Sequence, residues 1–171
     1  NATTGAVSII AAANFEAKAS YSFNVTASDG ALFSRSVTLA VTNVNEAPTV
    51  SSAATATVAE NGAANAVVYT ATATDVDAGT TLTYSLGGAD AGLFTINAAT
   101  GAVSLTTAAN FEAKASYAFS VTASDGALSS AAQAVTLAVT NVNEAPVNTS
   151  AATATAIAEN GTAGAVVYTA S

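Results

Sequence analysis

Acidic side chains are the residues of this chain best suited to chemistry, and they are concentrated in a few places. The 171 residues include 11 Asp and Glu but only 3 Lys and Arg, which gives a formal net charge of −8. All of the acids except Asp90 fall in turn motifs or in short Asn-containing stretches between predicted strands. Clustered carboxylates accompanied by amide and carbonyl oxygens, without nitrogen or sulfur ligands, favour a hard cation such as Ca²⁺.

The composition also excludes several classes of function. The sequence has no Cys and no His, so it contains neither a Ser-His or Cys-His nucleophile pair nor a thiolate or imidazole metal site. Its acidic balance is unsuited to nucleic acid and to anionic membrane surfaces, which attract Lys and Arg. Hydrolysis by carboxylates alone needs two acids facing one pocket, whereas these acids map to the ends of a repeating unit. We therefore expect that this chain is not an enzyme.

A seven-residue stretch, TNVNEAP, organises the chain because it occurs twice, at 42–48 and at 140–146. Other segments repeat with nearly the same spacing: 14–21 matches 110–117, and the AENG of 59–62 returns at 158–161. A near-constant offset with small slips indicates tandem copies of one structural unit. We interpret TNVNEAP as a linker. The predicted domains are the end of one repeat (1–46), a complete repeat (47–144) and the start of another (145–171), so we expect the chain to be a segment of a longer protein.

Strict alternation of large apolar with small or polar residues predicts an all-β unit despite the many alanines. The run YAFSVTA at 117–123 has this period of two, which is the pattern of a half-buried strand. Turn signals such as Asn61-Gly62 and Asp125-Gly126 separate such runs. About seven strands predict an immunoglobulin-like β-sandwich. We expect them near 55–58, 67–74, 82–86, 94–96, 102–106, 117–123 and 135–140, with the first fragment repeating the last two and the last fragment repeating the first two.

Several short motifs follow one another in a fixed order through the complete unit. They are Ala59-Glu60-Asn61, Asp75-Val76-Asp77, Leu93-Phe94-Thr95-Ile96 with Thr100-Gly101, Asn110-Phe111-Glu112, Ala123-Ser124-Asp125 and Asn141-Val142-Asn143-Glu144-Ala145-Pro146. In type and order these motifs resemble those of the cadherin repeat. The unit is most similar to the Ala/Thr-rich cadherin-like repeats of large bacterial surface adhesins. The resemblance implies a seven-stranded, immunoglobulin-like sandwich and a place outside the cell.

The resemblance also implies where Ca²⁺ would bind, because cadherin ions lie between consecutive domains. Carried over residue by residue, the ligands at the first junction are Asn14, Glu16, Asn43, Asn45, Glu46, the Ala47 carbonyl, Asp75, Asp77 and Asp125. At the second junction they are Glu60, Asn110, Glu112, Asn141, Asn143 and Glu144. This chain has Asn at 14, 43, 110 and 141, where the family usually has Asp. Each exchange removes a negative charge but keeps an oxygen, so we expect fewer or weaker ions, in the ~10⁻⁴–10⁻³ M range of extracellular modules.

Two hypotheses for function remain open at this point. The first is a structural spacer of a cell-surface adhesin or fibre, made rigid by Ca²⁺ between repeats, whose partners are the neighbouring repeats of the same chain. The alternative is a binding module that associates with ligand or with identical chains, laterally or end to end, without calcium. Its predicted loops lack the aromatic and Arg residues typical of contact hot spots. Taken singly, Asp29, Asp125, Glu60 and Glu159 are also explained as ordinary turn or capping acids.

Overall fold

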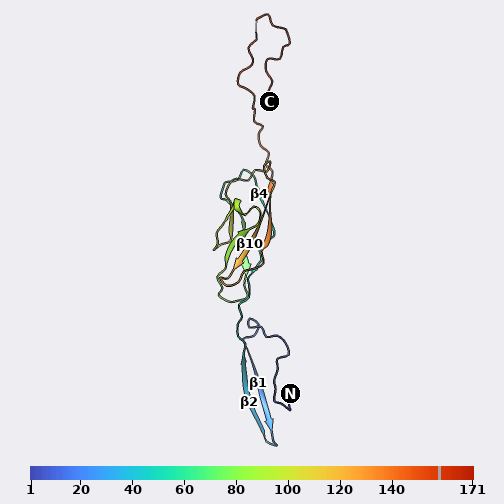
Figure 1. Ribbon diagram of the computed structural model, residues 1–171, viewed down its shortest axis with the longest axis vertical. Helices are drawn as coiled ribbons and strands as arrows, with labels where there is room; N and C mark the ends of the chain where they lie inside the picture. The colour runs from blue at the N-terminus through green and yellow to red at the C-terminus, as the bar shows by residue number, and fades with distance from the viewer. Residues whose placement is uncertain (158) are drawn as a thin grey trace. The chain divides into compact units, whose positions relative to one another are not determined.

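The computed structural model describes residues 1–157 and 159–171, and the chain divides into two compact units, Asn1–Asn141 and Val142–Ser171. The first unit contains a hairpin and a β-sandwich that includes the labelled strands β4 and β10 (Figure 1). Among the described residues, no helix is long and apolar enough to cross a bilayer.

The sandwich consists of a four-stranded sheet facing a three-stranded sheet. The first sheet has the order β4-β11-β10-β7, formed by Thr55–Ala59, Gln133–Thr140, Ser116–Ser124 and Thr83–Gly87. The second has the order β5-β9-β8, formed by Val67–Thr70, Ala102–Leu105 and Phe94–Ile96. All pairs are antiparallel except β4 with β11, where Thr55 lies opposite Thr136 in a parallel ladder. The predicted all-β sandwich is confirmed.

The core forms where alternating side chains of the two sheets meet. Phe119 of β10 is 2% exposed and contacts Tyr69 of β5 edge to face, with ring centroids 5.7 Å apart. Phe94 of β8 lies 4.7 Å from the Phe119 ring. Leu137 and Val103 are fully buried beside them. Tyr117 packs edge to face on Phe94 with ring centroids 5.6 Å apart. Aromatic pairs at such distances add to the hydrophobic stabilisation, so a core with many small side chains is anchored on these aromatic rings.

One glycine sets the separation between two crossing segments. Gly101 has φ +72°, and a Cβ at this position would lie 2.2 Å from the Ala71 carbonyl oxygen. The Ala71 amide donates to the Gly101 carbonyl oxygen at 2.9 Å, and Ala71 is 1% exposed. A residue with a side chain fits neither the backbone conformation nor the available space.

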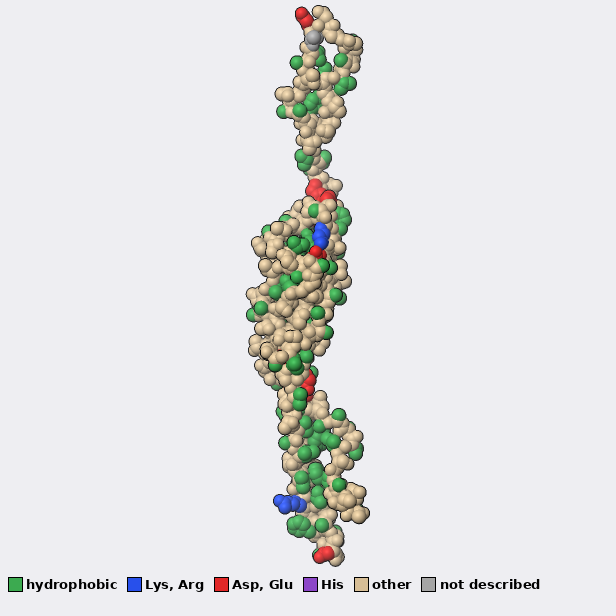
Figure 2. Space-filling model, in the orientation of Figure 1, with side chains coloured by type: hydrophobic (Ala, Val, Ile, Leu, Met, Phe, Trp, Pro, Cys, Tyr) green, Lys and Arg blue, Asp and Glu red, His purple; other side chains and the backbone are tan. Residues whose placement is uncertain are grey.

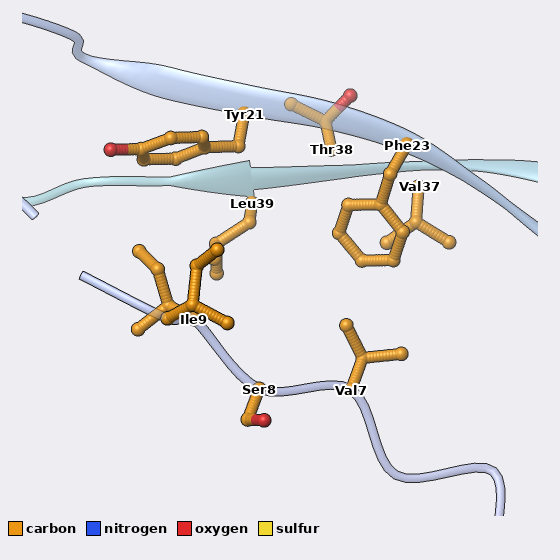
Figure 3. Close-up of a pocket in the computed structure, with 9 residues that line it drawn as sticks. Val7, Ser8, Ile9, Tyr21, Phe23, Val37, Thr38 and Leu39 are labelled. Carbon is orange, nitrogen blue, oxygen red and sulfur yellow. The ribbon is translucent and has the colours of Figure 1, made fainter. Parts of the chain in front are cut away.

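The leading hairpin consists of β1 (Ser20–Ser28) and β2 (Leu32–Ala40) and repeats the pairing of β10 with β11. Tyr21 lies opposite Leu39, as Tyr117 lies opposite Leu137. Figure 3 shows Phe23, Val37 and Leu39 extending from the strands toward the segment with Val7 and Ile9. A cavity of about 480 Å³ remains there. The hairpin's apolar face is less buried than its equivalent in the sandwich, since Leu39 is 47% exposed whereas Leu137 is fully buried.

The seven predicted strands of the complete repeat are all present, with two differences. The expected strand at 67–74 is divided into β5 and β6 (Ala73–Thr74), and β6 pairs with β3 (Thr49–Val50) in a two-stranded sheet that the sequence did not predict. A 3₁₀ turn, η1 (Ala91–Leu93), precedes β8. Two-residue strands are too short to show a period in the sequence.

The expectation of strands at the end of the chain was wrong. The second unit contains no strand among its described residues, 142–157 and 159–171. It retains backbone hydrogen bonds between its two extended segments, such as that from the Thr155 amide to the Val167 carbonyl oxygen at 3.1 Å. In the complete repeat the matching segments pair with β9 and β11, and 145–171 contains no copy of either strand. Strand formation here depends on pairing more than on propensity.

Candidate metal centre at the repeat junction

Three carboxylates from separate segments of the first unit converge at the first predicted junction. Glu16 lies in a turn before β1, Glu46 lies in the linker, and Asp77 lies in the loop between β6 and β7. Each offers an oxygen within 4.8 Å of the others, and we call these three residues the linker cluster. The charged side chains visible in Figure 2 are few against a mostly uncharged surface. A hollow of about 290 Å³ beside the cluster is lined by Phe15, Glu16, Asn43, Val76, Asp77 and Ala78.

Asp75 provides a further oxygen that the protein leaves without a hydrogen bond. Its Oδ1 accepts from the Asp77 amide at 2.9 Å. Its Oδ2 is inaccessible to solvent and has no hydrogen-bond partner among the described residues. A buried carboxylate oxygen without a donor is costly, and a nearby cation would offset that cost. The linker cluster offers the carboxylate oxygens that Ca²⁺ prefers, and the charge of Asp75 acts on Glu46 of this cluster.

Asp77 is held by two donors from the linker. Asn43 Nδ2 donates to Asp77 Oδ1 at 2.7 Å, and the Glu46 amide donates to Asp77 Oδ2 at 2.9 Å. These hydrogen bonds, that of Asn43 first, hold the pKa of Asp77 below its usual value. Asp77 therefore remains a carboxylate and ties the linker to the following repeat.

Asp125 is held in the same way from the other side of the linker. Asn45 Nδ2 donates to Asp125 Oδ2 at 2.7 Å. The amides of Ala127 and Leu128 both donate to Asp125 Oδ1 at 2.6 Å. The Leu128 amide, then Asn45, then the Ala127 amide lower the pKa of Asp125. Oδ1 of Asp125 thus closes an Asp-Gly turn, which is the ordinary turn role considered for this residue above. Oδ2 contacts the linker.

The pKa of Glu46 is shifted in the opposite direction, above its usual value. Loss of hydration beside neighbouring atoms is the largest cause that raises the pKa of Glu46, followed by the charges of Glu16, Asp77 and Asp75. The three surrounding acids therefore repel a charge at Glu46. Lys18, the basic residue nearest in sequence to Glu16, lies over the Tyr21 ring, 4.6 Å from its centroid. An added cation would relieve the repulsion at Glu46.

Part of the second predicted junction also lies in the first unit. Glu60 is 3% exposed, and its Oε2 accepts from the Phe111 amide at 2.8 Å. Glu60 and Glu112 each offer an oxygen within 4.8 Å of the other. Asn141 Nδ2 donates to Glu112 Oε1 at 3.0 Å. In this region the buried Glu60 therefore lies close to the exposed Glu112, and Glu112 also accepts a hydrogen bond from the Asn141 side chain.

The remaining predicted ligands have other surroundings. Ala47 is exposed in the linker, just before the buried Pro48. Asn143 and Glu144 belong to the second unit, where both are exposed. Asn14 Oδ1 accepts from the Ala17 amide at 2.6 Å, and Asn110 Oδ1 accepts from the Ala113 amide at 2.7 Å. Both asparagines thus cap turns through the oxygen that the family resemblance assigns to a metal. Asn is a common turn residue, but nothing in the sequence alone distinguishes a capping role from a metal-binding one at these positions.

Comparison with known proteins gives the same family as the motif order. Residues 54–143, more than half of the chain, match the family model of the cadherin domain. No curated protein matches the chain. Mouse cadherin-23 repeats EC22–24 superpose with a TM-score of 0.64 and 26% identity over 78% of this chain and 46% of that one. Human protocadherin-24 EC1-2 gives a TM-score of 0.65 at 19% identity, over 77% and 70% of the two chains.

The first of the matched structures, protocadherin gamma B2 domains 3–6, gives a TM-score of 0.66 and 23% identity. The match covers 81% of this chain and 36% of that structure, so the chain spans about a third of that multi-domain segment. At this sequence identity the structural match supports the β-sandwich fold alone. The match to the family model shows which family the chain belongs to. The chain belongs to the cadherin domain family.

Proposed function

We propose that this chain is an extracellular structural spacer of a cell-surface adhesin or fibre, in which Ca²⁺ bound between tandem cadherin repeats makes the junctions rigid. Cadherin domains are extracellular adhesion modules that generally bind Ca²⁺. The repeats extend over 1–46, 47–144 and 145–171, and their Ala/Thr-rich composition suits a bacterial surface adhesin. Neighbouring repeats of the same chain are the principal partners.

The observation that carries this proposal is that the clustered carboxylate oxygens come from three different parts of the chain. Glu16 belongs to the end of one repeat, Glu46 to the linker, and Asp77 to the next repeat, and Asp75 adds a buried oxygen without a donor. Ca²⁺ supplies the positive charge that these groups lack. Glu16, Glu46 and Asp77 would hold it, and their mutual repulsion would then no longer separate the three segments. The linker would keep one direction instead of flexing.

Thermal unfolding of the 171-residue chain across a Ca²⁺ titration tests this function. For a dissociation constant of about 1 mM, 10 mM Ca²⁺ stabilises the folded chain by about 1.4 kcal/mol. Asp75→Asn/Asp77→Asn should abolish that response. Asp29→Asn is the control, because Asp29 closes a turn at the hairpin tip by accepting from the Ala31 amide. No change in midpoint with Ca²⁺, or an equal loss of response in the control, would reject a calcium-stiffened junction.

A further inference from the structure

Two asparagines of the linker lie against acids of the following repeat, and both present nitrogen rather than oxygen to the acid. Asn43 Nδ2 lies 2.7 Å from Asp77 Oδ1, and Asn45 Nδ2 lies 2.7 Å from Asp125 Oδ2. Hydrogen bonds from an amide to a carboxylate are among the stronger ones in proteins. Both acids therefore have a side-chain donor in the linker.

The acids at this junction thus fall into two groups. Asp77 and Asp125 receive side-chain amides and, in addition, backbone amides on the same carboxylates. Asp75 Oδ2, in contrast, is buried and receives no donor among the described residues. Asp77 and Asp125 are satisfied by hydrogen bonds from the protein itself, whereas Asp75 Oδ2 is not.

In the second copy of the linker, the corresponding asparagine also donates to an acid, but to one of its own repeat. Asn141 is the counterpart of Asn43 in the identical TNVNEAP stretch, and its Nδ2 also donates to an acid, Glu112, at 3.0 Å. The same residue therefore restrains a carboxylate in both copies, although the acid differs.

We propose that Asn43 and Asn45 fasten the linker to the following repeat by hydrogen bonds that need no metal, so that this attachment persists without calcium, while Ca²⁺ held by Glu16, Glu46 and Asp77 adds the rigidity between the two repeats. This inference rests on the proposed function for the role of calcium. It deepens that function by saying which hydrogen bonds hold the linker when no calcium is bound. An aspartate at either position would replace an attraction by a repulsion. The attachment would then depend entirely on the cation.

Amide hydrogen exchange measured by NMR on the 171-residue chain tests the proposal, with the Glu46 amide as probe because it donates to Asp77 Oδ2. In EDTA the Glu46 amide should be protected in the native chain, and Asn43→Asp should accelerate its exchange about ten-fold or more. Added Ca²⁺ should restore protection in that variant. Asn24→Asp, on exposed strand β1, adds the same charge away from the junction and should behave as the native chain.

The outcomes separate this proposal from the calcium function. If the native Glu46 amide exchanges in EDTA as fast as in Asn43→Asp, and only Ca²⁺ slows it, the metal-free attachment is overturned while the calcium spacer stands. If the native amide is protected and Ca²⁺ changes nothing in any variant, the attachment stands and the calcium function falls. Asn43→Ala removes the donor without adding charge, and faster exchange in this variant supports the attachment even where Asn43→Asp fails to fold.

Discussion

Glu60 offers a sharp test of whether an acid of this fold is structural, metal-binding or both. Its carboxylate is 3% exposed and accepts the Phe111 amide at 2.8 Å. Glu60→Ala removes a charge-assisted hydrogen bond of about 1.5–3 kcal/mol and a buried methylene of about 0.8 kcal/mol. We therefore expect the unfolding free energy of the sandwich to fall by about 2–4 kcal/mol in calcium-free buffer.

Glu60→Gln separates the two roles, because its side-chain oxygen can still accept from Phe111 while the charge beside Glu112 is removed. Its stability without calcium should stay within about 1 kcal/mol of the native chain. Any calcium-dependent gain that Glu60 contributes should be lost. Urea unfolding in EDTA and in Ca²⁺ measures both quantities, provided that the m-value is unchanged. The reasoning fails if Glu60→Gln destabilises the chain as much as Glu60→Ala, or if Glu60→Ala costs less than about 0.5 kcal/mol.

Two further predictions use the internal copies and one glycine. Phe119→Ala should cost about 3–5 kcal/mol in urea unfolding, whereas Phe23→Ala, at the equivalent but less covered position, should cost much less; equal costs would contradict the packing described. Gly101→Ala should cost at least about 1–3 kcal/mol from backbone strain alone, with more from the clash with the Ala71 carbonyl. Gly79→Ala, at φ +83° with nothing within 4 Å, should cost only the strain, and similar thermal midpoints for the two variants would refute the clash.

Local pattern predicted the strands well because side-chain alternation is a property of neighbouring residues. The run at 117–123 and the segment 94–96 could be assigned without knowing their partners, and β10 and β8 are found there. Tertiary pairing was not predictable in the same way. The short pair β3 and β6 depends on a partner distant in sequence, and the end segment, 145–171, contains the residues of two strands but no described strand.

The site was predictable in its residue types but not in its hydrogen bonds. Glu16, Glu46 and Asp77 were assigned together from the family resemblance, and their carboxylates lie within 4.8 Å of one another. The donor role of Asn43 could not be predicted, because Asn offers both an oxygen and a nitrogen. Only the position of Asp77 relative to the linker decides which atom faces the acid.

In the two identical linkers, the acid that an asparagine contacts depends on which carboxylates are present around it. In the repeated stretch NFEAKASY, Asn14 and Asn110 cap the same turn at 2.6 and 2.7 Å, so local sequence is sufficient for that local structure. Asn43 donates to Asp77 of the following repeat, whereas Asn141 donates to Glu112 of its own repeat, because 145–171 includes no counterpart of Asp77. An amide that can serve either acid is a donor whose partner is chosen by which carboxylate the fold brings near. Calcium would act on the carboxylates that such amides leave unsatisfied.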